Sequence, residues 1–464
     1  MIVMKFGGSS VESAVAIERV AGIVRRELAR KPVVVVSAMG KTTQRLLTMG
    51  EKAAAGQRDQ AFEMLRSLGE MHEREIARLL PAEKHGDLRR ILDCHVREMA
   101  DLLQEVADLG EFTAKSVDAL SSYGERLSAR LIAMVFTAFG IEAAHVDARC
   151  VVITDSRHKA AAPLYSQTYS RAKEKILPLV SQNKVPVLGG FIGSTEDGVT
   201  TTLGRGGSDF TAAIIGAGIA AVEIQIWTDV DGVMTCDPKL VREARRVKTI
   251  SFAEAAELAY FGAKVLHPST LLPAIENNIP ILVLNSRRPE IGGTRIVSDA
   301  VSCSNLIKAI SCKRGVSIVN IRSTRMLMAH GFLYRIFEIF SRAETAVDML
   351  ATSEVSVSLT IDDPARLAEV CQALREFSEV SVEDNQAIVC IVGDNIRHTP
   401  GVAARAFGAL QGVNIRMISQ GASMLNLGFV VAAGDAEKAV QLLHREFFRS
   451  ADPEVFDEPA VPAI

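Results

Sequence analysis

The chain has 464 residues, enough for two to four domains. Its 52 lysines and arginines nearly balance 55 aspartates and glutamates, and the net charge of −3 argues against a nucleic-acid-binding protein. No apolar stretch reaches the ~20 residues that span a bilayer, we find no signal peptide, and the seven scattered cysteines form no CxxC pair. We therefore expect a cytoplasmic protein with no membrane partner and no metal site of its own.

The first ~300 residues alternate strand and helix patterns, which predicts an α/β fold with a mainly parallel sheet covered by helices. Continuous β-branched runs are typical of strands buried on both faces. The expected strands are Ile2–Phe6, Val33–Val36, Val185–Phe191 and Glu223–Thr228. The expected helices include Val11–Leu28 and a long charged stretch over 43–138 that Pro81 interrupts.

The C-terminal third contains an internal repeat with a spacing of 70 residues. Four residue types recur at that spacing: Gly331 and Gly401, Arg335 and Arg405, Phe337 and Phe407, Ser353 and Ser423. Both copies share one order of strands and helices, which favours duplication over chance.

The second copy lacks a final strand, and the apolar segment 306–311 before the first copy has no partner of its own. We hypothesise that this segment supplies the missing strand. The predicted boundaries are 1–298 for the α/β domain, 299–315 for a linker with that strand, 316–385 for the first copy and 386–464 for the second.

Two glycine-rich turns could hold anions. In Lys5-Phe6-Gly7-Gly8-Ser9-Ser10, two glycines follow a strand and precede a helix that Ser10 could cap, and a lysine stands beside the turn. A tight turn with a surface lysine explains this segment equally well. In Gly204-Arg205-Gly206-Gly207-Ser208-Asp209, the flexible loop presents an arginine suited to a carboxylate or phosphate. Asp209 could also be a simple helix cap.

Three further segments place charged residues where a ligand could meet them. Thr228-Asp229 ends a buried strand, where α/β sheets bind ligands. Phe261–Pro268 contains Lys264, and Ser121–Glu125 places a carboxylate in helical sequence. Taken singly, Lys264 and Glu125 could be solvated surface residues.

Together these motifs, in this order, resemble the aspartate kinase family. The resemblance spans nearly the whole chain and is closest to the monofunctional, lysine-sensitive type. It implies the amino acid kinase fold, a three-layer αβα arrangement, followed by two α+β ACT domains. It also implies ATP-dependent phosphorylation of the side-chain carboxylate of L-aspartate, with ATP and Mg²⁺ as cofactors.

The resemblance assigns roles to individual residues. Lys5, Asp209 and Lys264 would be catalytic: Lys5 stabilises the transferring phosphoryl group, Asp209 organises the centre of the site and Lys264 meets the nucleotide phosphates. The substrate would meet Ser37, Thr42, Glu125, Arg205 and Ser208, with Glu125 on its α-ammonium and Arg205 on a carboxylate. The nucleotide would be held by Lys5, Gly7, Gly8, Ser9, Thr228, Asp229, Met234, Lys239, Lys264 and Val265. Met234 and Lys239 depart from the tyrosine and arginine common in the family.

The resemblance further implies feedback by an amino acid at the first ACT copy, with lysine expected and threonine as the alternative. The effector positions are Met326, Phe332, Leu333, Val347, Asp348, Thr352, Ser353 and Glu354. Asp348 and Glu354 could meet ammonium groups, whereas Ala329 and Ala346 replace expected serines. Pairing of ACT repeats between subunits implies a homodimer or homotetramer.

Other functions stay open at this point. Glutamate 5-kinase and acetylglutamate kinase share the fold, although they do not usually combine the Gly204–Asp209 loop with two ACT copies. A catalytically silent amino-acid sensor is a second alternative, against which the intact Lys5, Glu125, Arg205 and Asp229 argue.

Overall fold

The computed structural model describes residues 1–262, 271–299, 305–326 and 330–458. The chain divides into two compact units. The first comprises Met1–Gly232 and Val265–Ser298, and the second comprises Val233–Lys264 and Asp299–Ile464. Among the described residues, no helix has the length and apolar character needed to cross a membrane.

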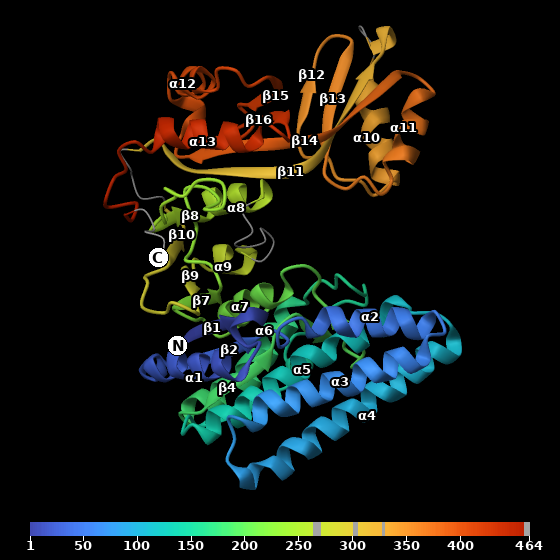
Figure 1. Cartoon of the computed structure of the whole chain (residues 1–464), viewed down its shortest axis with the longest axis vertical. Helices are drawn as coiled ribbons and strands as arrows, with labels where there is room; N and C mark the ends of the chain where they lie inside the picture. The colour runs from blue at the N-terminus through green and yellow to red at the C-terminus, as the bar shows by residue number, and fades with distance from the viewer. Residues whose placement is uncertain (263–270, 300–304, 327–329, 459–464) are drawn as a thin grey trace. The chain divides into compact units, whose positions relative to one another are not determined.

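The first unit is built on a mainly parallel sheet (Figure 1). Its strands lie in the order β3-β4-β2-β1-β7-β9-β10, and the edge strand β10 runs antiparallel to β9. The bounds are β1 Ile2–Phe6, β2 Pro32–Val36, β3 Ala143–Val146, β4 Val185–Gly189, β7 Glu223–Thr228, β9 Ile281–Asn285 and β10 Thr294–Val297. A separate small hairpin pairs β5 Ile192–Ser194 with β6 Thr200–Thr202. The expected fold class is confirmed.

Helices cover both faces of this sheet because alternate residues of a strand point to opposite sides. Ile2, Met4 and Phe6 of β1 share a core with α1 Ala14–Arg26 and α5 Ala114–Ala138. Val3 points the other way, toward α7 Gly207–Gly218, where a Cβ at Gly216 would lie 3.8 Å from its side chain. Two more helices of this unit are α6 Tyr165–Ser181 and α9 Leu272–Glu276.

The long helical stretch forms four helices that lie side by side (Figure 1). They are α2 Thr42–Ala54, α3 Arg58–Ala77, α4 His85–Leu109 and α5. Besides the break around Pro81, the chain turns at Gly56 and Gly110, whose φ angles of 76° and 65° favour glycine. The sequence analysis identified the proline and missed these two turns.

The first helix begins later than predicted. It starts at Ala14, and the side chain of Ser13 accepts a hydrogen bond from the Ala16 N–H as its cap. Ser10 is therefore not the cap. Its hydroxyl lies 2.7 Å from that of Ser286, far along the sequence. Gly8–Ser10 forms a short 3-10 turn before the helix.

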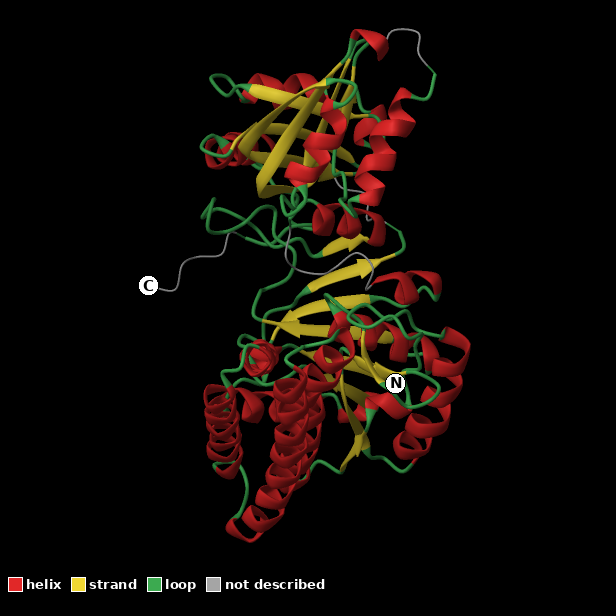
Figure 2. Ribbon diagram, turned by 90° about the vertical axis from the view of Figure 1, so that its right-hand side faces the viewer, coloured by secondary structure: helices red, strands yellow, loops and turns green. Residues whose placement is uncertain are grey.

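The second unit contains a six-stranded antiparallel sheet in the order β12-β13-β11-β14-β16-β15, visible in a second view (Figure 2). Its strands are β11 Ile307–Arg322, β12 Leu350–Thr352, β13 Ser356–Ile361, β14 Glu379–Gly393, β15 Ile415–Gln420 and β16 Asn426–Ala432. Its helices are α8 Phe252–Tyr260, α10 Phe332–Arg342, α11 Leu367–Arg375, α12 Val402–Ala409 and α13 Ala436–Phe447, and β8 Thr249–Ser251 precedes α8.

Two long strands run through both copies of the repeat. The first half of β11 pairs with the last residues of β14, so that Ile310 lies opposite Ile391. Its second half pairs with the start of β14, so that Ile321 lies opposite Val380. Segment 306–311 thus contributes to the sheet beside the second copy, which is the pairing our hypothesis requires. The predicted domain boundaries stay predictions.

Matching contacts in the two copies support the duplication. Gly331 and Gly401 precede α10 and α12 with φ angles of 80° and 84°. The guanidinium of Arg335 lies 4.1 Å from the ring centre of Phe377, and that of Arg405 lies 4.9 Å from the ring centre of Phe447. The two phenylalanines are again 70 positions apart.

A buried ion pair fastens α8 to β11 within the second unit. Lys308 Nζ lies 3.0 Å from Glu254 Oε1, and their side chains are 1% and 0% exposed. The other oxygen of Glu254 accepts hydrogen bonds from the backbone N–H and hydroxyl of Ser251, which closes a capping box at the start of α8. These contacts explain why residues 233–264 group with the C-terminal unit.

We predict that Lys308→Met lowers the melting temperature of the full chain strongly, because breaking a buried pair from one side costs about 3–5 kcal/mol. The double variant Lys308→Met/Glu254→Gln should lose less than Lys308→Met alone, since no buried charge is left unpaired. Arg342→Met, which breaks an exposed pair with Glu338, is the control. Equal losses in Lys308→Met and Arg342→Met would contradict the prediction.

Candidate active site

A cavity of about 320 Å³ opens at the carboxyl ends of the central strands of the first unit. Ligands in parallel α/β sheets bind at this edge. Lys5 comes from β1, Ser37 follows β2, and Phe191 follows β4. The full lining is Lys5, Ser37, Thr43, Glu125, Phe191, Gly204, Gly206, Gly207, Ser208 and Asp209. Residues from five separate parts of the sequence therefore meet here.

Lys5 and Asp209 form an ion pair inside this cavity. The Lys5 Nζ lies 2.7 Å from Asp209 Oδ1, and both side chains are mostly buried. Asp209 is the third residue of α7, and Gly206 occupies the cap position with φ of 72°. Asp209 is therefore not the helix cap, and its carboxylate instead fixes the position of the lysine ammonium.

Glu125 is a buried carboxylate with an unused oxygen. It is 4% exposed, and its Oε2 finds no hydrogen-bond partner among the described residues. Burial raises the pKa of Glu125 to about 8, although hydrogen bonds from the backbone at Ala38 and Glu125 partly offset this effect. Buried polar atoms nearly always have a partner. An unpartnered carboxylate facing a cavity is thus suited to receive a cation from outside the chain.

Two glycines at the end of β4 allow these groups to approach one another. A Cβ at Gly189 would lie 3.0 Å from the Cβ of Glu125. A Cβ at Gly190 would lie 2.7 Å from the Cα of Ser208. Any larger residue would push α5 or the start of α7 away from the strand, and would separate Glu125 from Ser208.

The first glycine turn is held by backbone contacts. The Gly7 N–H donates to the carbonyl of Trp227 at 3.1 Å, so it is already used. A Cβ at Gly8 would lie 2.9 Å from the carbonyl oxygen of Gly40. Close packing against 38–40 thus explains Gly8 without a ligand. The roles of Gly7, Gly8 and Ser9 toward a nucleotide stay predictions.

Not every predicted substrate residue reaches the cavity. Thr42 does not line it: its hydroxyl donates to the carbonyl of Met39 at 2.7 Å, and Thr43 lines the cavity in its place. Arg205 is exposed on the same loop as Gly204 and Gly206 and is outside the lining. Thr42 lies in the first turn of α2 and Arg205 lies in a loop. The direction of a side chain at such positions cannot be predicted from residue spacing.

The predicted nucleotide residues are spread over both units. Thr228 and Asp229 lie at the end of β7, where the Ser286 hydroxyl donates to the Thr228 carbonyl at 3.1 Å. Met234 and Lys239 belong to the second unit. Lys264 and Val265 lie outside the described residues.

The sequence analysis missed Asp118, a fully buried carboxylate on α5. It accepts hydrogen bonds from His158 Nδ1 at 2.7 Å, the Lys159 N–H at 3.0 Å and the Thr202 hydroxyl at 2.6 Å. Thr202 stands just before the Gly204 loop. Asp118 therefore ties that loop to the helix that carries Glu125 seven residues later, on the same face. An acid at helical spacing from Glu125 is the signal that could have revealed it.

The effector positions lie in the first copy of the repeat. Phe332 and Leu333 begin α10, Thr352 ends β12, and Ser353 and Glu354 follow it. Phe332 is buried against Phe377, with ring centres 5.5 Å apart, and so belongs to the core of this copy. Met326 and Val347 pack at the edge of the same core. Asp348 is nearly buried and already holds the ammonium of Lys313.

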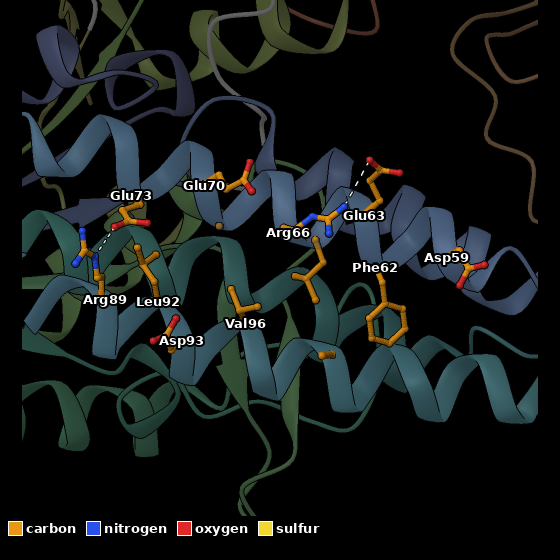
Figure 3. Close-up of a pocket in the computed structure, with 13 residues that line it drawn as sticks. Asp59, Phe62, Glu63, Arg66, Glu70, Glu73, Arg89, Leu92, Asp93 and Val96 are labelled. Carbon is orange, nitrogen blue, oxygen red and sulfur yellow. Dashed lines mark hydrogen bonds and ion pairs between the residues drawn. The ribbon is translucent and has the colours of Figure 1, made fainter. Parts of the chain in front are cut away.

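A larger groove of about 660 Å³ lies between α3 and α4 (Figure 3). Phe62, Leu92 and Val96 line it with apolar atoms. Its two arginines are already paired, Arg66 with Glu63 at 3.6 Å and Arg89 with Glu73 at 2.7 Å. This groove lacks polar groups that converge on one point, so the smaller cavity is the candidate active site.

Comparisons with known proteins agree with this geometry. A model of the Amino acid kinase family matches residues 1–285, and a model of an ACT domain matches residues 389–447. Aspartokinase 1, chloroplastic, of Arabidopsis thaliana is 40% identical over 97% of this chain and 80% of its own length. Lysine-sensitive aspartokinase 3 of Escherichia coli is 38% identical over 97% of this chain and 99% of its own.

A solved structure of E. coli aspartokinase III in complex with aspartate and ADP superposes with a TM-score of 0.83 at 36% identity. It covers 97% of this chain and 100% of that one. Its complex with lysine and aspartate gives a TM-score of 0.82, with 97% and 99% covered. The chain therefore belongs to the aspartokinase family.

Proposed function

We propose that this chain, as an aspartate kinase, transfers the terminal phosphoryl group of ATP to the side-chain carboxylate of L-aspartate, giving 4-phospho-L-aspartate. The observation that carries the proposal is the buried, unpartnered oxygen of Glu125 in a cavity that also holds the Lys5–Asp209 pair. An amino-acid substrate has an ammonium group that can bind the Glu125 oxygen. It also has a carboxylate that can react near the Lys5–Asp209 pair.

Glu125 binds the substrate's α-ammonium in this proposal. An ionised carboxylate buried without a partner is costly, and a cation within hydrogen-bonding distance removes that cost. The site therefore favours substrates that carry an ammonium group. Because the pKa of the free Glu125 is about 8, the carboxyl group gives up its proton when the ammonium binds at neutral pH.

Lys5 stabilises the charge of the phosphoryl group in transit. Phosphoryl transfer needs alignment and charge neutralisation more than covalent help from the protein. Asp209 holds the Lys5 ammonium in place. No general base is required, because the attacking carboxylate is already ionised at pH 7. Ser37, Ser208 and the exposed Arg205 complete the substrate side.

The nucleotide is proposed to lie at Thr228 and Asp229, with Met234, Lys239, Lys264 and Val265 contributing from the chain that follows. Mg²⁺ fits as an ion carried by the nucleotide. The described residues contain no group of three or more His, Cys, Asp or Glu side chains able to form a protein cage. Mg²⁺ is commonly held by substrate phosphates and water with one or two carboxylates. When bound, it supplies further positive charge to the phosphates.

We further propose feedback by lysine at the first ACT copy and a homodimer or homotetramer formed through the ACT domains. One neighbouring structure contains lysine with aspartate, which supports the choice of effector. The first-copy residues Asp348, Thr352, Ser353 and Glu354 are the proposed contacts. Threonine is the alternative effector.

The direct test is ADP release from Mg-ATP by the full chain, with L-aspartate or L-glutamate as acceptor and with or without lysine. We expect turnover with aspartate, little with glutamate, and suppression by lysine. Turnover with glutamate alone would indicate a different amino acid kinase. A folded chain that binds lysine and turns over neither acceptor would be a sensor and would overturn the proposal.

Burying the Glu125 carboxyl group lowers the stability of the free protein. Its folded-state pKa lies above the ordinary value of 4.5, so its burial destabilises the free protein increasingly as the pH rises from about 4.5 to 8. Glu125→Gln should abolish turnover. At pH values above 8 it should also raise the melting temperature by about 2 °C or more, and at pH 5 the increase should be smaller.

Asp118→Asn is the matched control on the same helix. Because its carboxylate is fully hydrogen-bonded, this variant should lower the melting temperature at every pH. The comparison is made by thermal unfolding of each variant at pH 5, 7 and 8.5. A Glu125→Gln variant that is less stable than the parent chain at pH 8.5 would contradict the assignment of an unpartnered carboxylate.

A further inference from the structure

A lysine of the chain itself occupies an ammonium-binding cluster in the second unit. The Lys313 Nζ lies 3.0 Å from both carboxylate oxygens of Asp348 and 2.7 Å from Asp362 Oδ2. It also lies 5.4 Å from the ring centre of Tyr260, within cation–π range. Two carboxylates and an aromatic face are the groups that recognise a primary ammonium.

The cluster joins three elements of this unit. Lys313 belongs to β11, Asp362 follows β13, and Tyr260 is the last residue of α8, which lies beside β11 (Figure 1). The backbone N–H of Asp348 donates to Thr360 at 2.9 Å and so anchors this carboxylate to β13. Burial, the charge of Asp348 and a hydrogen bond with it raise the pKa of Tyr260 to about 12. Asp348 is thus enclosed by Lys313 and Tyr260.

Asp348 is also the carboxylate to which the family resemblance assigns the effector. Its side chain is 4% exposed, whereas that of Lys313 is 18% exposed. A second ammonium cannot approach the enclosed oxygens while Lys313 remains. Two ammonium groups held against the same carboxylate would repel each other strongly in this partly buried setting. Lys313, with its long flexible stem, can instead swing into solvent.

We propose that Lys313 is a built-in competitor at an effector site, so that an amino-acid effector binds only by displacing its ammonium from Asp348. The inference rests on the proposed regulation by an amino acid. Displacement exchanges one ammonium for another and gains little by itself, so Lys313 raises the effector concentration needed for binding. It also removes the cation from the ring of Tyr260, which precedes Lys264 by four residues in the sequence.

The test titrates the full chain with L-lysine by calorimetry, without ATP or aspartate. Lys313→Met keeps the apolar stem and removes the ammonium, and should lower the dissociation constant by about fivefold or more, a typical size for removing a coupled competitor. Arg314→Met removes the same charge from the next position and should leave the constant unchanged. Asp348→Asn should abolish measurable binding. Lys313→Gln should shift affinity in the same direction as Lys313→Met and guards against a folding defect.

Equal or weaker lysine binding by both Lys313 variants would overturn the proposal, because Lys313 would then support the effector or play no part. If the parent chain binds no lysine, binding gained by Lys313→Met supports the proposal and its absence overturns it. Turnover of aspartate measured without lysine reports on the kinase separately. A failed kinase assay therefore does not obscure the result of the binding titration.

Discussion

The active site depends on the carboxyl group of Glu125, which is buried with one oxygen unpartnered and therefore destabilises the free protein. Close packing holds it there: glycines at 189 and 190 let β4 approach both Glu125 and Ser208. Asp118 secures the neighbouring loop through Thr202, and the Lys5–Asp209 pair joins β1 to α7. The structure around the cavity thus holds a carboxyl group that can ionise where a substrate ammonium meets it.

Carboxylates that can bind an ammonium group also occur in the second unit, but there they are already occupied. At Asp348 and Asp362 the ammonium already present belongs to Lys313. A site left open binds its substrate readily, whereas a site filled by the chain's own lysine responds only when the competing ligand is abundant. This difference suits an enzyme that binds its substrate continuously and its effector only in excess.

Much of the fold could be predicted because the buried strands are short, mostly apolar segments: β1 and β7 have the expected bounds. The true cap of α1 could not be predicted, since both Ser10 and Ser13 are able to cap a helix; in the structure Ser13 caps α1, and Ser10 contacts the distant Ser286. In the site, Lys5, Ser37, Glu125, Ser208 and Asp209 were predicted through the resemblance and do line one cavity. Thr43 and Asp118 depend on side-chain orientation and tertiary contacts, which spacing does not reveal.

The most direct test of the role of Glu125 is to measure the number of protons released when aspartate binds at pH 7. Calorimetric titration in buffers with different ionisation enthalpies gives this number. With a pKa of about 8 for Glu125 in the free enzyme, binding at pH 7 should release close to one proton, and at pH 9 almost none. A binding enthalpy that does not depend on the buffer at pH 7 would contradict the central claim that Glu125 is protonated in the free enzyme and ionises when it receives the substrate ammonium.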